Sequence, residues 1–212
     1  MKFAKIWVSV LAFLTITGCA TSRSVVPIDV PVARDGGVQT ESIFIESVVD
    51  NRTFEEAPRI PSTPSLGFDG ANAASDEMKA RAIGRKRNGY GKALGDVFLP
   101  ENQTVEELIR KYATAAFNDA GWRVVDNAGA DQTVAIQIDE LWAWFKPGFW
   151  AITLNSNVST TLKFVRNGVQ IPVSVHVEDT RQMATEGAWK EIVEMALEEY
   201  RGKVRASVPM PR

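Results

Sequence analysis

Few residues of this chain have the chemistry of a catalytic or metal site. Its 212 residues include one Cys, Cys19, and one His, His176, which is too few for a zinc site. The adjacent carboxylates Asp139-Glu140 and Glu178-Asp179 fall in predicted strands, where neighbouring side chains point to opposite faces. His176 falls on the polar register of a strand and is expected to be exposed. We therefore predict no catalytic residue, no metal and no cofactor, so the protein is expected not to be an enzyme.

Cys19 follows a segment with the character of a secretory signal. Residues 1–18 contain two lysines, a short apolar run and then small and polar residues. The apolar run is too short to cross a bilayer, which takes about 20 residues. Residues 16–19, Ile-Thr-Gly-Cys, resemble the bacterial lipobox. That resemblance implies that residues 1–18 are a lipoprotein signal peptide and that Cys19 carries a diacylglycerol thioether and an N-linked acyl chain such as palmitate.

The acylation implied for Cys19 predicts where the protein lies. One acyl chain gives marginal membrane affinity, whereas two or more make the anchor stable. The residue after Cys19 is Ala20 rather than Asp, which in enteric-type sorting implies the periplasmic leaflet of the outer membrane. The membrane is therefore an expected partner, and the protein is predicted to be anchored to it without spanning it.

Composition excludes several other classes of protein. The chain has 24 Lys and Arg against 26 Asp and Glu, a formal charge of −2, and 45% hydrophobic residues. This is the composition of an ordinary globular protein and not of a multi-span membrane protein or a disordered tail. Nucleic acid is not an expected partner, because its binding requires a concentrated basic surface.

The predicted organisation after residue 18 is a tether and one domain. Residues 19–40 contain prolines and a glycine pair and are expected to form a lipidated tether, part of which, 25–32, lies along a sheet edge. Residues 41–208 are expected to form a single α+β domain. Within it, 51–102 shows no clear period apart from a short helical turn near 75–82, so it is predicted to be a long irregular segment.

Two amphipathic helices and several strands can be read directly. A capping box at Thr104 and Glu107 starts a helix over 104–120, and a second apolar stripe predicts a helix over 185–205. Strands are expected over 42–49, 122–125, 134–145, 150–164 and 169–177. The predicted fold class is α+β, a two-layer sandwich with a mainly antiparallel sheet and both helices packed on one face.

A basic run and an aromatic group are the remaining candidates for a binding site. The glycine-rich stretch 84–95 has the wrong spacing for a phosphate or dinucleotide loop, so no nucleotide is expected. It still concentrates positive charge that suits anionic head groups, glycan phosphates or an acidic partner, unless it is simply a solvated loop. Aromatic residues flank the turn at 147–148, where alternation cannot bury every ring. The candidate contact residues are Arg81, Arg85, Lys86, Arg87, Lys92, Trp144 and Trp150.

From residue 104 onward the chain resembles the YajG-type family of small bacterial outer-membrane lipoproteins. The features that carry the resemblance are the lipobox ending in Cys19, the step 120–124, the strand 133–138, the alternating strand around 155–161 and the helix after 186–187. Segment 51–102 is longer and more basic than this pattern. The family has no established activity, so the resemblance transfers no site residue beyond Cys19.

These observations predict an outer-membrane-anchored periplasmic lipoprotein that acts as a non-catalytic binding or assembly accessory, with a possible envelope protein partner. The alternative is a lipoprotein that binds an envelope lipid or glycan through the basic loop 81–95 and the neighbouring aromatic residues.

Overall fold

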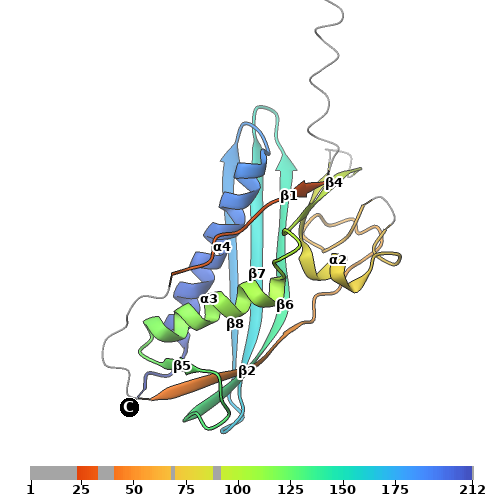
Figure 1. Ribbon diagram of the computed structural model, residues 1–212. Helices are drawn as coiled ribbons and strands as arrows, with labels where there is room; N and C mark the ends of the chain where they lie inside the picture. The colour runs from red at the N-terminus through yellow and green to blue at the C-terminus, as the bar shows by residue number, and fades with distance from the viewer. Residues whose placement is uncertain (1–22, 33–40, 68–69, 88–91, 212) are drawn as a thin grey trace, which may run out of the picture.

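A computed structural model describes residues 23–32, 41–67, 70–87 and 92–211 (Figure 1). Within these residues it contains eight strands and three helices in an open α+β arrangement, as the sequence predicts. In chain order they are β1 (Ser24–Val25), β2 (Ser42–Asp50), α2 (Asp76–Arg81), β3 (Ala82–Arg87), β4 (Ala93–Phe98), α3 (Val105–Asp119), β5 (Arg123–Val125), β6 (Gln132–Pro147), β7 (Ile152–Phe164), β8 (Gln170–Arg181) and α4 (Glu186–Ser207). The predicted signal peptide and Cys19 lie outside the described residues.

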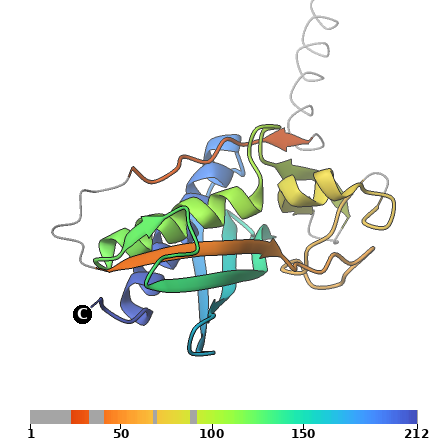
Figure 2. The same ribbon diagram turned by 60° about the horizontal axis from the view of Figure 1, so that its bottom comes forward.

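The two long helices form where their local signals predict. Thr104 caps α3, with the reciprocal bond from the Glu107 side chain, and Gly121 after the helix has a φ of +94°. Thr185 caps α4. The apolar stripes of both helices pack on one face of the sheet and form the main hydrophobic core (Figure 2). This confirms the prediction that both helices cover the same face.

The sheet is built around the long strand β6. Along its whole length β6 pairs with β7, which pairs with β8, and both pairings are antiparallel. On its other edge β6 pairs in parallel first with β2 and then with β3. Beyond β3 the sheet continues with β4 and then β1, and beyond β2 it continues with β5. Most paired residues are antiparallel, as predicted, although the parallel pairs make the sheet mixed.

A bulge in β6 gives the sheet two hydrophobic faces. The register shifts between Ile138 and Glu140, so one extra residue reverses the alternation of the side chains. Before the bulge Ile138 faces the helices, and after it Leu141 does. Trp142 and Trp144 consequently point to the opposite face, where they form a second buried cluster.

The prediction that 51–102 is irregular throughout is wrong for its second half. Residues 76–87 form α2 and β3, and 93–98 form β4; the short helical turn expected near 75–82 corresponds to α2. Residues 51–67 and 70–75 do lack regular structure, and we call them the covering segment. Phe54, Leu66 and Ala74 of this segment pack against the Trp142 and Trp144 cluster. The irregular part therefore closes the sheet face that the helices leave open.

The predicted tether is partly a component of the domain. Residues 24–25 form β1, which pairs in parallel with β4, and Val26 and Ile28 are buried in the main core. The expected position of residues 25–32 on a sheet edge is confirmed only at the start of the stretch, because residues after 26 leave the sheet and contact Gln103 and the two long helices. Gln103 fastens it further through two hydrogen bonds with the backbone of Ile28. The domain thus begins at about residue 24 and not at 41.

Arg52 fills the gap that β2 and β3 leave beside β6. Strand β2 pairs with β6 as far as Ile138, and β3 begins to pair only at Ala143. In between, Arg52 Nη1 donates to the backbone oxygens of Leu141 at 3.0 Å and Ala82 at 2.6 Å. Its side chain also makes a bidentate ion pair with Asp50. One guanidinium therefore joins three strands where the backbone ladder is interrupted.

Two glycines allow a matched test of this junction. A Cβ at Gly84 would lie 2.6 Å from the Ala143 carbonyl oxygen, whereas one at Gly202 in α4 would contact nothing within 4 Å. We expect Gly84→Ala to lower the free energy of unfolding by about 2 kcal/mol, because β3 must move away from β6. Gly202→Ala should raise it by about 0.5–1 kcal/mol through helix propensity. Urea unfolding measures both. Equal effects of the two substitutions would contradict the close approach of β3 to β6.

Candidate functional site

The predicted basic patch is largely folded into the protein. Lys86 and Arg87 are buried, and Arg85 is only partly exposed. Lys86 Nζ donates to Ser24 Oγ at 2.8 Å, and Arg87 donates to the Pro58 carbonyl and the Ser65 hydroxyl. The interpretation of these side chains as an exposed binding surface is therefore wrong. In place of a ligand, they hold β1 and the covering segment on β3.

The other two basic candidates lie at the edges of this region. Arg81 donates from Nε to the Leu99 carbonyl at 3.1 Å, while Lys92 is exposed just before β4. The structure does not bring them together with the buried cations as one surface. A ligand contact by either residue stays a prediction.

Asp96 is the acidic centre of the buried basic cluster. Its side chain is fully buried and lies 3.9 Å from the guanidinium nitrogens of both Arg23 and Arg85. The backbone amide of Gly67 donates to Asp96 Oδ1 at 2.9 Å, while Oδ2 has no hydrogen-bond partner. Burial raises the pKa of Asp96, and the Gly67 hydrogen bond and the nearby cations oppose that rise. The role of Asp96 as a buried partner of these cations could not be predicted from the sequence, because only the tertiary fold buries it.

The aromatic group divides into a buried pair and an exposed pair. Trp142 and Trp144 lie in the cluster under the covering segment, where Phe54 packs edge-on against Trp142 with ring centroids 5.9 Å apart. Phe149 and Trp150 lie in the turn between β6 and β7 and are 90% and 84% exposed. Trp150 therefore remains available for contact, whereas Trp144 is not.

A polar network lies on the sheet face beside Trp144. His176 is exposed, as predicted, and stacks on the Trp144 ring at 5.9 Å. His176 Nδ1 lies 2.6 Å from Asn157 Oδ1, and Asn157 Nδ2 donates to Glu140 at 2.8 Å. An amide separates the imidazole from the carboxylate, so the network does not form a direct acid–base pair.

Metal and cavity geometry offers little further chemistry. In the described ranges, no three His, Cys, Asp or Glu side chains come together as a possible metal site. A cavity of about 320 Å³ lies at the β5 end of the sheet and has one titratable side chain, Glu41. The other residues that line it are Trp122, Gln132, Phe164, Asn167, Pro209 and Met210.

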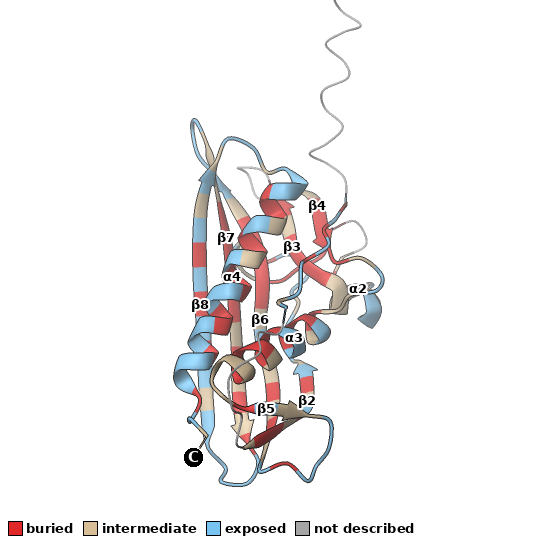
Figure 3. Ribbon diagram, turned by 60° about the vertical axis from the view of Figure 1, so that its left-hand side comes forward, coloured by how far each residue is buried: buried red, intermediate tan, exposed pale blue. Residues whose placement is uncertain are grey.

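The arrangement of the strands brings the N-terminal segment and the exposed aromatic pair to one end of the sheet. Arg85 of β3 pairs in parallel with Trp144 of β6, and β4 runs antiparallel to β3. Because β1 is parallel to β4, the chain enters β1 from the end at which β6 finishes. The turn with Phe149 and Trp150 lies at that same end (Figures 1 and 3). We call it the N-terminal end of the sheet.

No protein-family model matches the chain, and no curated protein matches it by sequence. Among solved structures it is similar to protein XCC0632 of Xanthomonas campestris, of family DUF330, with 12% identity over 88% of this chain and 94% of that one and a TM-score of 0.45. It is also similar to lipoprotein GNA1162 of Neisseria meningitidis, with 12% identity over 57% and 93% of the chains and a TM-score of 0.27. These values establish no family for the chain, and the YajG-type resemblance stays a prediction. None of the helices in the described residues has the length and apolar character that crossing a membrane requires.

The raised pKa of Asp96 predicts a specific pH dependence of stability. A carboxyl group whose pKa is higher in the folded chain stabilises the fold fully below its ordinary pKa of about 4. That contribution is lost as the pH rises through the folded pKa. Asp96→Asn removes the titration and keeps an acceptor for the Gly67 amide. The free energy of unfolding of the wild type minus that of the variant should therefore fall as the pH is raised.

The size of this effect is about 1.4 kcal/mol for each unit by which the pKa is raised. Urea unfolding of both proteins at a series of pH values from acid to neutral measures it. If the free energy of unfolding of the wild type minus that of the variant instead increases with pH, the cations around Asp96 lower its pKa by more than burial raises it.

Proposed function

We propose that the protein is a lipid-anchored protein of the bacterial envelope, acylated at Cys19, whose domain is held close to the membrane as a non-catalytic binding or assembly accessory. The observation that carries this proposal is the early start of the fold. The sheet begins at Ser24, only five residues after the lipobox cysteine. The sequence motif supports the anchor, and the packing of residues 24–28 supports a short link to it.

The short link limits how far the domain can stand from the lipid. Arg23 is four positions after Cys19, and an extended chain covers at most about 3.6 Å per position. The Cα atoms of these two residues are therefore no more than about 14 Å apart. A protein tethered so closely acts on partners at the membrane surface and does not reach across the periplasm. Ala20 supports the outer membrane as its location.

The uncovered edge of β8 supports an accessory role in binding. This strand has 12 residues and pairs, within the described part of the chain, with β7 alone. Its buried residues face α4, while Ser174, His176 and Glu178 are exposed. Apart from the Ser174 carbonyl, which accepts from Lys203 Nζ at 2.7 Å, an edge of this length offers unpaired backbone groups to an incoming strand. The basic loop of the alternative lipid or glycan function, in contrast, has two of its cations buried.

Removal of the acylated thiol tests the anchor. We expect Cys19→Ala to prevent lipidation, so that labelled palmitate is no longer incorporated and the protein leaves the membrane fraction. The domain should stay folded, because its first strand begins after Cys19, at Ser24. Fractionation of cells that express wild type or variant measures the change, with Ala20→Asp as a sorting control that keeps the acyl chains. Full retention of Cys19→Ala in membranes would contradict the proposal.

Photo-crosslinking tests the β8 edge as a binding surface. A crosslinking amino acid at Gln170 or Ser174 should give the same discrete adduct in cells, because both positions are exposed on β8. The same substitution at Lys111, exposed on α3, provides the matched control. An adduct at twice the mass of the chain would identify a second copy as the partner. If β8 gives no more adduct than Lys111, the edge is not the binding surface.

A further inference from the structure

The turn between β6 and β7, residues 148–151, carries the most exposed aromatic rings of the described chain. We call it the hairpin tip. Phe149 is 90% and Trp150 is 84% exposed, and their rings pack edge to face with centroids 4.8 Å apart. The Gly148 amide donates to the Ala151 carbonyl at 2.8 Å and closes the turn. A side chain at Gly148 would lie 2.5 Å from that carbonyl, so the turn is tight and presents both rings outward.

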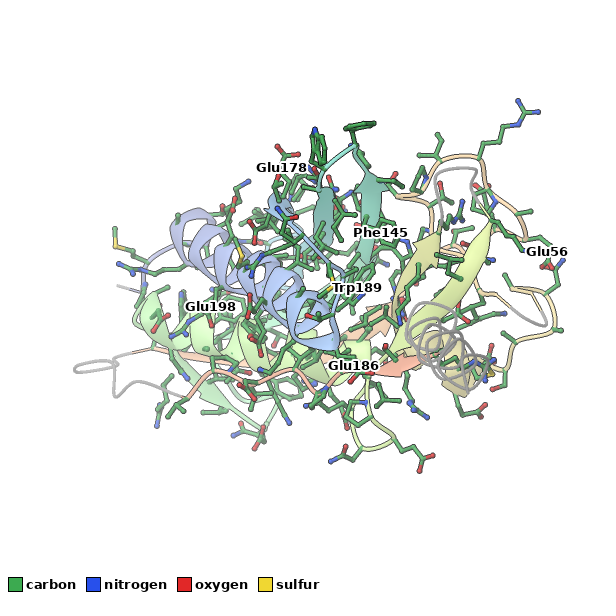
Figure 4. The ribbon with its side chains drawn as sticks, turned by 90° about the horizontal axis from the view of Figure 1, so that it is seen from above. Glu56, Phe145, Glu178, Glu186, Trp189 and Glu198 are labelled. Carbon is green, nitrogen blue, oxygen red and sulfur yellow. The ribbon has the colours of Figure 1, made fainter. Side chains whose placement is uncertain are left out.

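Packing in the hydrophobic core does not require aromatic residues at positions 149 and 150. At this end the core is closed by Phe145 of β6 and Trp189 of α4, whose ring centroids are 6.1 Å apart (Figure 4). The hairpin tip extends beyond this contact. In the neighbouring connection between β8 and α4, Met183 is 69% exposed. Large apolar side chains gathered at one end of a domain mark a contact surface.

The position of the hairpin tip indicates what it contacts. Trp144 pairs with Arg85, which in turn pairs with Asp96, so Trp144 lies at about the level where the chain enters β1. Strand β6 continues three residues past Trp144, to Pro147, which corresponds to about 10 Å at the rise of a strand, and the tip lies beyond that point. The link from Arg23 back to Cys19 begins at the same end of the sheet and can span up to about 14 Å. The rings and the acylated cysteine can therefore reach the same plane.

We propose that the hairpin tip inserts Phe149 and Trp150 into the head-group region of the phospholipid bilayer, as a second membrane contact beside the acyl chains of Cys19. This inference rests on the proposed anchoring. Trp and Phe combine large apolar area with few rotatable bonds, and Trp also has an N–H donor, which is why Trp favours the membrane–water interface. Lys146, exposed at the base of the tip, suits the phosphate groups at that depth.

The second contact would determine how the domain is oriented. An acylated N-terminus alone leaves the domain free to rotate about its link. Strands β4 and β3 lie between β1 and β6 in the sheet, so β1 is three strand spacings away from the strand that carries the tip. At 4.8 Å for each spacing, β1 and β6 are about 14 Å apart, so an anchor linked to β1 together with a contact at the tip would hold the sheet with its β5 end away from the membrane.

Lipid-dependent quenching of tryptophan fluorescence tests the proposal. Trp122, Trp142, Trp144 and Trp189 are all buried, so Trp150 is the one tryptophan of the described domain that lipid can reach. The full lipidated protein is reconstituted in phosphatidylethanolamine and phosphatidylglycerol vesicles with brominated acyl chains. We expect quenching in the wild type and a loss of about twofold or more in Trp150→Phe. Trp122→Phe, at the opposite end of the sheet, should leave the quenching unchanged.

Flotation of the same vesicles separates this inference from the anchoring. If the protein floats and Trp150→Phe is quenched as strongly as the wild type, the hairpin tip does not enter the bilayer and the inference is overturned. The same holds if neither protein is quenched, and the rings would then serve contact with a protein. If the protein does not float, the anchor itself has failed. Because Trp150 is exposed, unchanged unfolding of the variant verifies that its fold is intact.

Discussion

The two halves of the sheet depend on the guanidinium of Arg52. On one edge, β6 pairs first with β2 and then with β3. Between these two pairings, the backbone carbonyl of Leu141 in β6 faces no neighbouring strand. A buried carbonyl without a partner costs about 1–3 kcal/mol, and Arg52 supplies the missing donor. The same side chain donates to the Ala82 carbonyl at the start of β3 and to the Lys79 carbonyl in α2. Asp50 balances its charge, so a buried cation is tolerated where three strands meet.

The bulge in β6 sets the second requirement of the fold. It turns Trp142 and Trp144 away from the helices, and two indole rings on an open sheet face would leave a large apolar area in water. The covering segment buries them and is itself fastened by Arg87 and Asp96. Lys86 in the same cluster holds Ser24. The basic residues thus hold both the segment that covers one face of the sheet and the N-terminal strand, from which the proposed link to Cys19 begins.

The sequence allows the helices and the long hairpin to be predicted because their signals are local. Thr104 and Thr185 cap regular apolar stripes, β8 alternates strictly, and β7 alternates from Asn157 onward. Strands β3 and β4 could not be recognised, because Arg85, Lys86 and Arg87 read as solvated until partners from three other segments bury them. The bulge at Asp139 has no local signal either, since it depends on the register with β7. For the same reason the exposed aromatic residues were not separable from the buried ones.

The location of the free edge follows from these constraints. Strands β6, β7 and β8 extend between the β5 end of the sheet and the hairpin tip, so the anchoring proposed above would hold them roughly along the membrane normal. In that orientation the 12 residues of β8 would extend about 40 Å from the bilayer. A partner that added a strand there would meet the protein along its full height. The short link would therefore limit the orientation of the domain, and that orientation would determine how the open edge of β8 is presented to a partner.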